Sequence, residues 1–347
     1  MSAAPHNIPF KYRRVTRSTF LPAFLLATLV LLVLAPLCLS FGPETLSLGS
    51  IARAFLGTGE DSVISTIIFE LRLPRVLLAI SVGAALSMTG ATFQALLKNP
   101  LAEPYILGVS NGCAVGAILG FLLGISQAGI TGLSFAGGLV VVLMVLWIGR
   151  RSLGTGSDAM LLGGVMVAAI GAAILFLLLH LLGAQVRSAI QWMLGDLSGA
   201  TPEIGYISIG LFGALLVASF FSGNIMNALA LGEEQAAALG LNVKRATVLY
   251  YIGSSLVVGI TTSFCGAIGF VGLVVPHIVR RIVGPDHRLL LPLTVVVGGS
   301  FLLVCDTIAR SLLPLTETGG GELPVGAVTA LFGAPLFIWL LKNSGKR

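Results

Sequence analysis

The sequence predicts an all-α, polytopic membrane protein with ten transmembrane helices. Of its 347 residues, 56% are hydrophobic and only 10% are charged, whereas a soluble domain carries roughly 25% charged residues. Uncharged runs of about 20 residues, the length that crosses a bilayer, recur along the chain. Basic residues gather in alternate connections between those runs, as the positive-inside rule requires. The spans should be helical because backbone groups in lipid must find partners within their own segment.

The ten expected spans follow one another closely. The first lies behind a basic stretch and has no small-residue cleavage site after it, so we expect an uncleaved span and not a signal peptide. Two of the apolar stretches are each long enough for a pair of spans. The complete set is 20–40, 76–97, 104–149 (two), 159–186, 204–222, 246–279 (two), 289–313 and 323–341. They form one transmembrane domain over residues 20–342, with cytoplasmic tails at 1–19 and 343–347.

The distribution of basic residues sets the orientation. With the amino terminus inside and the spans alternating, 15 of the 20 Lys and Arg residues fall in cytoplasmic connections. The residues that fall outside are Arg53, Arg72, Arg75, Arg187 and Arg310. Removing one span would put basic segments on both faces, so ten spans with both termini cytoplasmic are favoured. The net charge of +6 then follows from membrane orientation and requires no nucleic-acid partner.

Two glycine patterns predict local structure. Gly112, Gly116, Gly120 and Gly124 recur every fourth residue, so we expect the third span to pack closely against a neighbour. The second pattern is "GAIGFVG" at 266–272. From there to the next basic residues the chain is too short for a crossing at about 1.5 Å per residue. We therefore expect irregular or re-entrant backbone there, buried inside protein.

Two features are expected on the outer side. The segment 186–199 has the pattern of an amphipathic helix at the outer surface, with Trp192 at interfacial depth. Asp306 and Arg310 lie four residues apart in "CDTIAR", so they can pair on one helix face. That pair is either a structural ion pair or a means of presenting Arg310 at the outer face.

The sequence carries no motif for enzymatic chemistry. It lacks a G-x-x-x-x-G-K-[ST] loop for ATP, a nucleophile elbow and an H-E-x-x-H zinc motif. Its four cysteines lie singly in apolar runs, so neither a disulfide nor a metal site is expected. We predict a non-enzymatic chain with no cofactor or metal. Moving a solute across the membrane would then draw energy from an ion gradient or from a partner protein.

One polar stretch, "LGEEQAAALGLNVKRA" at 231–246, interrupts the apolar chain on the predicted cytoplasmic face. Ala, Glu, Gln and Leu favour a helix, and the helix dipole favours Glu233 and Glu234 in its first turn. Gly240 suits the end of that helix, and Asn242 can cap the next one. The stretch is either a solvated loop or a knob that fits a partner's groove, and its small-residue surface favours docking.

Six ordered motifs resemble the FecCD-type permeases of type II ABC importers, and most of all the cobalamin-importing members. The motifs are "LRLPRVLLAISVGAALSMTGA", "QALLKNPLAEPYILGVSNG", "LALGEEQAAALGLNV", "GAIGFVGLVVPHIVRRIVGPDHRLLLP", "CDTIAR" and "ELPVGAVTALFGAPLFIWLL". The first 70 residues match only in character. The resemblance implies a homodimer with ten spans per subunit. It also implies two ATPase subunits on the cytoplasmic side and a periplasmic substrate-binding protein opposite.

The resemblance also implies a coupling segment at 231–243, which would dock in the ATPase groove as a short cytoplasmic coupling helix. The residues assigned to it are Leu231, Gly232, Glu233, Glu234, Ala237, Leu239, Gly240, Leu241 and Asn242. On the outer face, Arg72, Arg75 and Arg310 match positions that receive glutamates of the binding protein. Exposed charges of this kind steer docking and set its register.

Two cytoplasmic gates are implied in the same way. Asn99 and Leu101 of "KNPLAEP" match one gate, and its two prolines fix the turn. Thr155, Gly156 and Ser157 of "LGTGSDAM" match the second gate. Gly156 stands where the family often has Ser or Thr.

These features predict the permease subunit of an ATP-driven importer in the bacterial inner membrane. Its substrate would be a bulky metal chelate, namely cobalamin, haem or a ferric siderophore, and ATP and Mg would bind only to the partner ATPase. The alternative is a gradient-driven secondary transporter or channel that acts without an ATPase. That alternative requires intramembrane ion ligands and inverted repeats, and neither is clear in the sequence.

Overall fold

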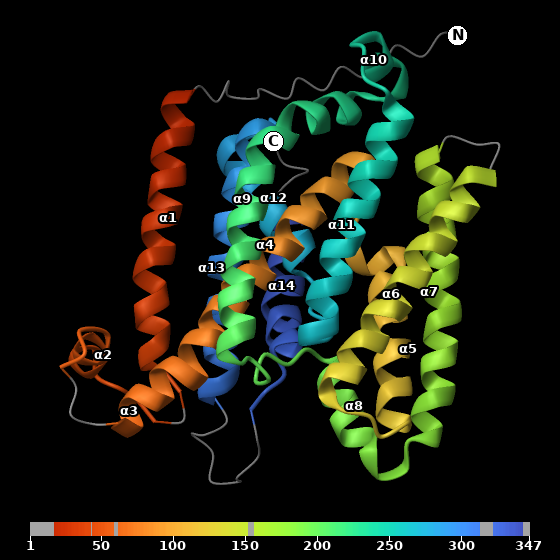
Figure 1. The fold of residues 1–347 in the computed structure, drawn as a ribbon. Helices are drawn as coiled ribbons and strands as arrows, with labels where there is room; N and C mark the ends of the chain where they lie inside the picture. The colour runs from red at the N-terminus through yellow and green to blue at the C-terminus, as the bar shows by residue number, and fades with distance from the viewer. Residues whose placement is uncertain (1–16, 43, 59–61, 152–155, 313–321, 343–347) are drawn as a thin grey trace.

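The computed structural model describes residues 17–42, 44–58, 62–151, 156–312 and 322–342. Every regular element in those ranges is helical, which confirms the predicted all-α class. Within those described ranges, seven helices are long and apolar enough to cross a membrane. Figure 1 shows the long helices side by side, with the short helix α10 (Glu233–Ala238) at one end. We call that end the α10 face and the opposite end, which carries the short helices α2, α3 and α8, the α8 face.

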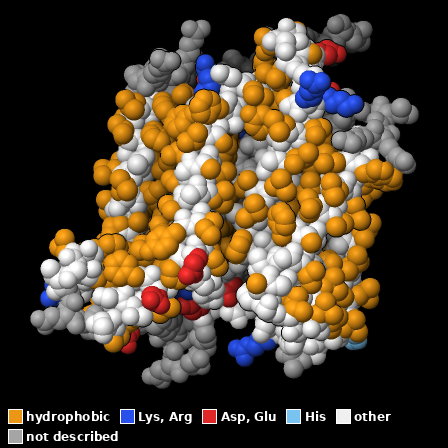
Figure 2. All heavy atoms as spheres, viewed as in Figure 1, with side chains coloured by type: hydrophobic (Ala, Val, Ile, Leu, Met, Phe, Trp, Pro, Cys, Tyr) orange, Lys and Arg blue, Asp and Glu red, His pale blue; other side chains and the backbone are white. Residues whose placement is uncertain are grey.

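Ten helices of the described ranges match the ten predicted spans in order. They are α1 (Arg17–Ser40), α4 (Leu73–Leu96), α5 (Val109–Leu122), α6 (Gln127–Arg151), α7 (Gly156–Leu181), α9 (Pro202–Leu231), α11 (Val243–Cys265), α12 (Val271–Val283), α13 (His287–Leu312) and α14 (Val325–Lys342). The remaining elements are α2 (Leu48–Phe55), α3 (Ser62–Thr66), the π-helical turn η1 (Ile67–Arg72), the 3-10 turns η2 (Pro104–Leu107) and η3 (Gly183–Gln185), and α8 (Val186–Met193). Figure 2 shows hydrophobic side chains over the middle of the molecule and charged ones towards its two ends.

The centre of the bundle is α4, in which every residue from Pro74 to Leu96 except Leu77 is buried. Small residues let its neighbours approach at backbone distance, as expected for helices that pack in lipid. Gly83 faces the backbone of Gly298 on α13, and Gly90 faces the backbone of Gly272 on α12. Figure 1 shows α4 crossing the molecule obliquely between the other helices. Helices that touch α4 therefore cannot shift without disturbing the core.

Helix α5 is shorter than the predicted third span, whereas α12 is short, as the sequence predicted. Helix α5 has 14 residues and α12 has 13, so at about 1.5 Å per residue each covers only part of a bilayer's width. Both start inside the protein behind a residue with left-handed backbone, Gly108 for α5 (φ 79°) and Phe270 for α12 (φ 68°). Residues 266–270 are non-helical, so the expected break in "GAIGFVG" is confirmed there, whereas Val271 and Gly272 belong to α12.

The outer segment also differs from the prediction. Helix α8 ends at Met193, and residues 194–199 are not helical. Trp192 is buried at 6% exposure and packs in a cluster with α5 residues, so its side chain faces protein and not the surrounding lipid. The non-helical backbone that follows is satisfied by protein, because Asp196 N donates to Cys265 O at 2.8 Å and Gly326 N donates to Leu194 O at 3.0 Å. Such pairing is what permits irregular backbone inside a membrane protein.

The expected close packing of the third span is confirmed between α5 and α6 at Gly112, Gly116 and Gly120, whereas Gly124 lies beyond the end of α5, where an added methyl group would meet nothing. A methyl group added at Gly116 would overlap the carbonyl oxygen of Leu133, whereas one added at Gly132 would meet nothing. We expect Gly116→Ala to destabilise the chain by about 1–3 kcal/mol, since overpacking forces the two helices apart. Gly132→Ala, the same change on α6, should leave stability unchanged. Unfolding of both variants in mild detergent would measure this, and equal stability of the two would contradict the packing argument.

Candidate functional site

The polar stretch folds as its sequence predicts. Gly232 ends α9 with a φ of 122°, and the short α10 follows with Glu233 and Glu234 in its first turn. Gly240 has a φ of 82°. The side chain of Asn242 then caps α11, because its Oδ1 accepts from Arg245 N at 3.0 Å. Each of these steps uses a residue suited to a helix end.

The α10 segment presents a mixed surface to the outside. Leu231 and Leu239 are 63% and 68% exposed, whereas Ala236 is fully buried and fixes the helix against the bundle. Glu233, Glu234 and the small Ala237 are also exposed. Two exposed leucines beside acidic and small side chains form a protruding surface with both apolar and charged contacts to offer.

The first predicted gate is a tight loop between α4 and η2. Lys98 adopts left-handed backbone with a φ of 48°. Asn99 closes the turn, because its Oδ1 accepts from Leu101 N at 2.9 Å and its carbonyl accepts from Ala102 N at 3.0 Å. The Leu101 side chain is 46% exposed at the tip of the turn. A side chain that projects from a rigid turn is well placed to obstruct a path.

The second predicted gate is largely outside the structural description. Thr155 lies outside the described residues. Gly156 and Ser157 form the first turn of α7.

The loop of the first gate is joined to α12 by Glu103, a contact that the sequence analysis missed. Glu103 Oε1 accepts from Phe270 N at 2.6 Å, so its carboxyl group caps the start of α12. Burial raises the pKa of this carboxyl group, while the Phe270 amide opposes that shift. The signal was present in the sequence as an acid between the two prolines of "KNPLAEP", but its partner lies 167 residues away.

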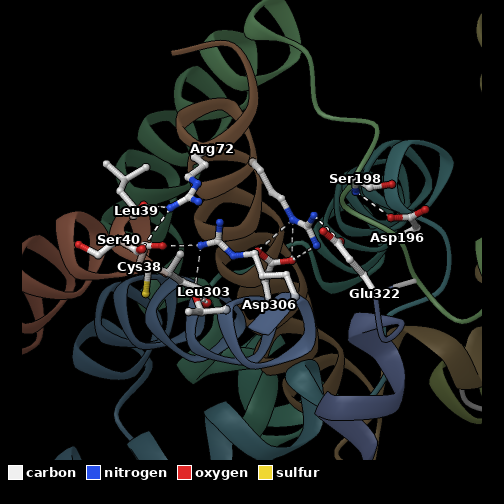
Figure 3. A network of polar contacts seen from close by, with 12 residues as sticks. Cys38, Leu39, Ser40, Arg72, Asp196, Ser198, Leu303, Asp306 and Glu322 are labelled. Atoms are coloured by element: carbon white, nitrogen blue, oxygen red, sulfur yellow. Dashed lines mark hydrogen bonds and ion pairs between the residues drawn. The ribbon is translucent and has the colours of Figure 1, made fainter. Parts of the chain in front are cut away.

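A buried ion-pair cluster lies near the start of α4 (Figure 3). Arg75 Nη2 donates to Asp306 Oδ1 at 2.9 Å, and Arg75 Nε donates to both carboxylate oxygens at 3.0 and 3.2 Å. On its other side, Arg75 Nη1 donates to Glu322 Oε2 at 2.6 Å. The Asp306 side chain is fully buried, whereas that of Glu322 is 33% exposed. Arg75 thus ties α13 and the segment before α14 to α4.

The expected i, i+4 pair of Asp306 and Arg310 is the weaker of the two contacts that Asp306 makes. Arg310 Nε lies 3.6 Å from Asp306 Oδ2, beyond hydrogen-bond length. Arg310 Nη2 donates instead to the carbonyl oxygen of Cys38 on α1 at 2.6 Å. Sequence spacing identified the local pair, but the dominant partner of Asp306 is Arg75, 231 positions away.

The three predicted docking arginines are close together but are not the exposed charges that the sequence suggested. Their exposures are 7% for Arg72, 9% for Arg75 and 3% for Arg310. Arg72 donates to the carbonyl oxygens of Leu39 and Ser40 at 2.7 and 3.1 Å. Their predicted exposure is wrong, because Arg72 and Arg310 bind backbone carbonyl groups of α1. Arg75 on α4 is instead enclosed by its ion pairs with Asp306 and Glu322.

The cluster nevertheless borders an opening on the α8 face. A pocket of about 320 Å³ is lined by Glu44, Ile67, Leu71, Arg72, Arg75, Arg310 and Glu322. All three predicted arginines therefore contribute to one concave surface. A carboxylate entering the pocket would meet guanidinium groups that are held in place by their neighbours.

A second polar contact lies near the α10 face. Asn227 on α9 donates through Nδ2 to Asp286 Oδ1 at 2.7 Å and accepts from His287 N at 2.8 Å through its Oδ1. Hydrogen bonds from Arg288 lower the pKa of Asp286 to about 2, so this carboxylate is ionised at neutral pH. The contact ties the last turns of α9, just before α10, to the start of α13.

The chain is similar to known proteins in three comparisons: with a family model, with individual relatives and with solved structures. The model of the FecCD transport family matches residues 28–343. A cobalamin import permease, BtuC, of Halobacterium salinarum is 39% identical over 288 residues, which are 82% of this chain and 76% of the relative. The vitamin B12 import permease BtuC of Escherichia coli is 40% identical over 283 residues, which are 80% of this chain and 84% of the relative.

A solved structure is similar over nearly its full length. It is a metal-chelate type ABC transporter in an inward-facing conformation, with a TM-score of 0.81 and 30% identity. The match covers 92% of this chain and 98% of the other. Family, relatives and fold agree with a multi-pass membrane chain and with the motifs that carry the resemblance. The chain therefore belongs to the FecCD transport family and is a permease of the ABC-importer type.

Proposed function

We propose that this chain is the transmembrane subunit of an importer that moves a bulky metal chelate into the cytoplasm, driven by ATP hydrolysis in partner subunits. The observation that supports the proposal is the presence of two distinct surfaces at opposite ends of one bundle. A protruding α10 segment lies at one end, and an arginine-lined pocket lies at the other. The chelate is cobalamin, haem or a ferric siderophore, with cobalamin named for two of the relatives.

The α10 segment is the proposed contact with the ATPase. Its exposed Leu231 and Leu239 supply apolar area, and Glu233 and Glu234 supply charge complementarity. Gly232 and Gly240 permit the sharp turns on either side of α10, since both have positive φ. Two copies of this chain and two ATPase subunits would form the complex.

The arginine-lined pocket is the proposed contact with the periplasmic binding protein. A glutamate of that protein would approach Arg72, Arg75 and Arg310 in a site where their positions are already fixed. Because the guanidinium groups are partly neutralised by Asp306 and Glu322, we propose that they set register more than they supply affinity. This assignment places the α8 face in the periplasm and both termini in the cytoplasm of a bacterial inner membrane.

Reconstitution tests this function. We expect proteoliposomes that contain the permease and its ATPase to take up chelate only with ATP and the loaded binding protein. Permease alone should neither hydrolyse ATP nor transport. Uptake by the permease alone, driven by an imposed ion gradient, would contradict the proposal and favour a secondary transporter. Supplying cobalamin, haem and a ferric siderophore in parallel would identify the substrate.

A further inference from the structure

The sequence pattern did not predict that the α4–α5 loop contacts α12. The loop carries Asn99 and Leu101, and Glu103 follows two residues later. The Glu103 carboxyl group reaches the backbone amide of Phe270 at 2.6 Å, where α12 begins. A helix start has unpaired amides and a positive dipole end, so an acidic side chain is a strong partner for it.

The receiving end of this contact is strained. Phe270 has a φ of 68°, a left-handed backbone conformation that residues with a Cβ atom rarely adopt. Such a conformation persists only where its surroundings impose it. Here the Phe270 side chain packs against Gly333 of α14, and its amide is held by Glu103. The carboxyl group of Glu103 therefore helps to hold the start of α12 in this conformation.

Packing around the contact makes the loop and α12 one unit. Gly272 in the first turn of α12 has Pro104 within reach, so the residue next to Glu103 also packs against this helix. Gln94, in the last turn of α4, donates through Nε2 to Gly272 O at 3.3 Å. Its Oε1 accepts from Arg280 Nη2 at 3.0 Å. The end of α4 and the loop after it are thus attached to both ends of α12.

The far end of α12 leads towards the α10 face. The chain passes from α12 to Asp286 and His287, which bind Asn227 on α9, and α9 runs directly into α10. A continuous set of contacts therefore connects α10 to the α4–α5 loop. A chain of contacts does not by itself establish that its two ends are coupled. The hydrogen bond from Glu103 is the contact in this chain that a single substitution can remove selectively.

We propose that Glu103 is a positioning residue of the transport cycle. Its carboxyl group fixes the α4–α5 loop to the start of α12, so the loop that carries Leu101 follows α12 when that helix moves. The role of the loop in closing the path rests on the proposed function, whereas its attachment through Glu103 does not. Loss of the attachment frees the loop, and ATP hydrolysis then continues with little uptake.

Hydrogen exchange of the full chain in detergent tests the attachment. We expect Glu103→Ala to raise exchange at Phe270 and in the loop 97–108 by roughly tenfold, the effect of losing one charge-assisted hydrogen bond. Glu103→Gln keeps an oxygen acceptor of the same reach but loses the charge, so its exchange rate should lie between those of wild type and Glu103→Ala. Glu203→Ala, a control at an exposed acid on α9, should change neither region. Unchanged exchange in Glu103→Ala, or equal loss of protection in Glu103→Gln, would overturn the proposal.

The functional part is tested in the assembled transporter. We expect Glu103→Ala to lower the number of chelates imported per ATP hydrolysed by roughly tenfold, in line with the loss of that hydrogen bond, with hydrolysis retained. Glu103→Gln should restore the ratio in part. If exchange responds as expected but the ratio is unchanged, the attachment stands and the loop is not a gate. If no variant or wild-type sample transports, the proposed function fails independently of the exchange result.

Discussion

Replacing Asp306 with alanine should lower the free energy of unfolding by about 3–5 kcal/mol, the cost of breaking a buried ion pair by removing one partner. The Asp306 side chain is fully buried and accepts three hydrogen bonds from Arg75. Its removal leaves Arg75 with only Glu322, and leaves Arg310, 3% exposed, without its ion-pair partner. The two guanidinium groups would then repel each other inside the bundle with little water to screen them.

Reversible unfolding by SDS in mixed micelles would measure the loss. Glu322→Ala removes the other carboxylate that binds Arg75, but its side chain is 33% exposed, so about 1 kcal/mol or less is expected. Asp306→Asn keeps the shape and removes the charge, and it should fall between the two. A loss for Asp306→Ala no larger than that for Glu322→Ala would mean that the buried pair does not hold α4 to α13.

Reversing both charges of α10 should weaken association with the ATPase without unfolding the permease. In the Glu233→Arg, Glu234→Arg double variant, we expect binding to weaken by roughly tenfold or more, because mismatched charges at an interface cost several kcal/mol. Both side chains are exposed, so stability in detergent should change little. Co-purification of the ATPase with tagged permease would measure the association.

A matched control exists at the other end of α9. Glu203 is an exposed acid in the first turn of that helix, on the face opposite α10. Glu203→Arg should leave ATPase association intact in the absence of binding protein. Wild-type association in the double variant would place the ATPase contact elsewhere and remove the proposed role of α10.

Much of the fold could be predicted from local properties of the chain. Span positions follow from apolar runs. The turn around α10 follows from Gly232, Gly240 and Asn242, because helix ends depend on the residues at those ends. These features depend on neighbours within a few positions, and such neighbours are visible in a sequence.

The parts that could not be predicted depend on distant pairs. Asp306 was correctly placed near Arg310, but its main partner, Arg75, is set by the packing of α13 on α4. The arginines expected to be exposed are buried for the same reason, since the α1 carbonyl groups of Cys38 and Leu39 bind Arg310 and Arg72. Arg75 is buried against Asp306 of α13. Nothing in the local sequence reports which surface a neighbouring helix will cover.

Helix length was a second source of error. An apolar run predicts that residues are buried but does not reveal where a helix begins inside protein. Gly108 starts α5 after a 3-10 turn, which shortens the expected third span to 14 residues. The short length of α12 was predicted, but its start at Phe270 was not, because a phenylalanine in left-handed backbone could not be expected from propensity. The contact that holds it, from Glu103, comes from another part of the chain.

The central claim is that α10 is where the ATPase meets this permease, and cross-linking tests it most directly. Ala237 is exposed on α10, and the four native cysteines are buried, so a cysteine at position 237 supplies a selectively accessible thiol. In the assembled complex, a short photoactivatable thiol cross-linker on Ala237→Cys should join the permease to the ATPase, and ATP should change the yield. The same linker on Glu203→Cys should give no ATPase product. An ATPase product from Glu203→Cys, with none from Ala237→Cys, would contradict the account.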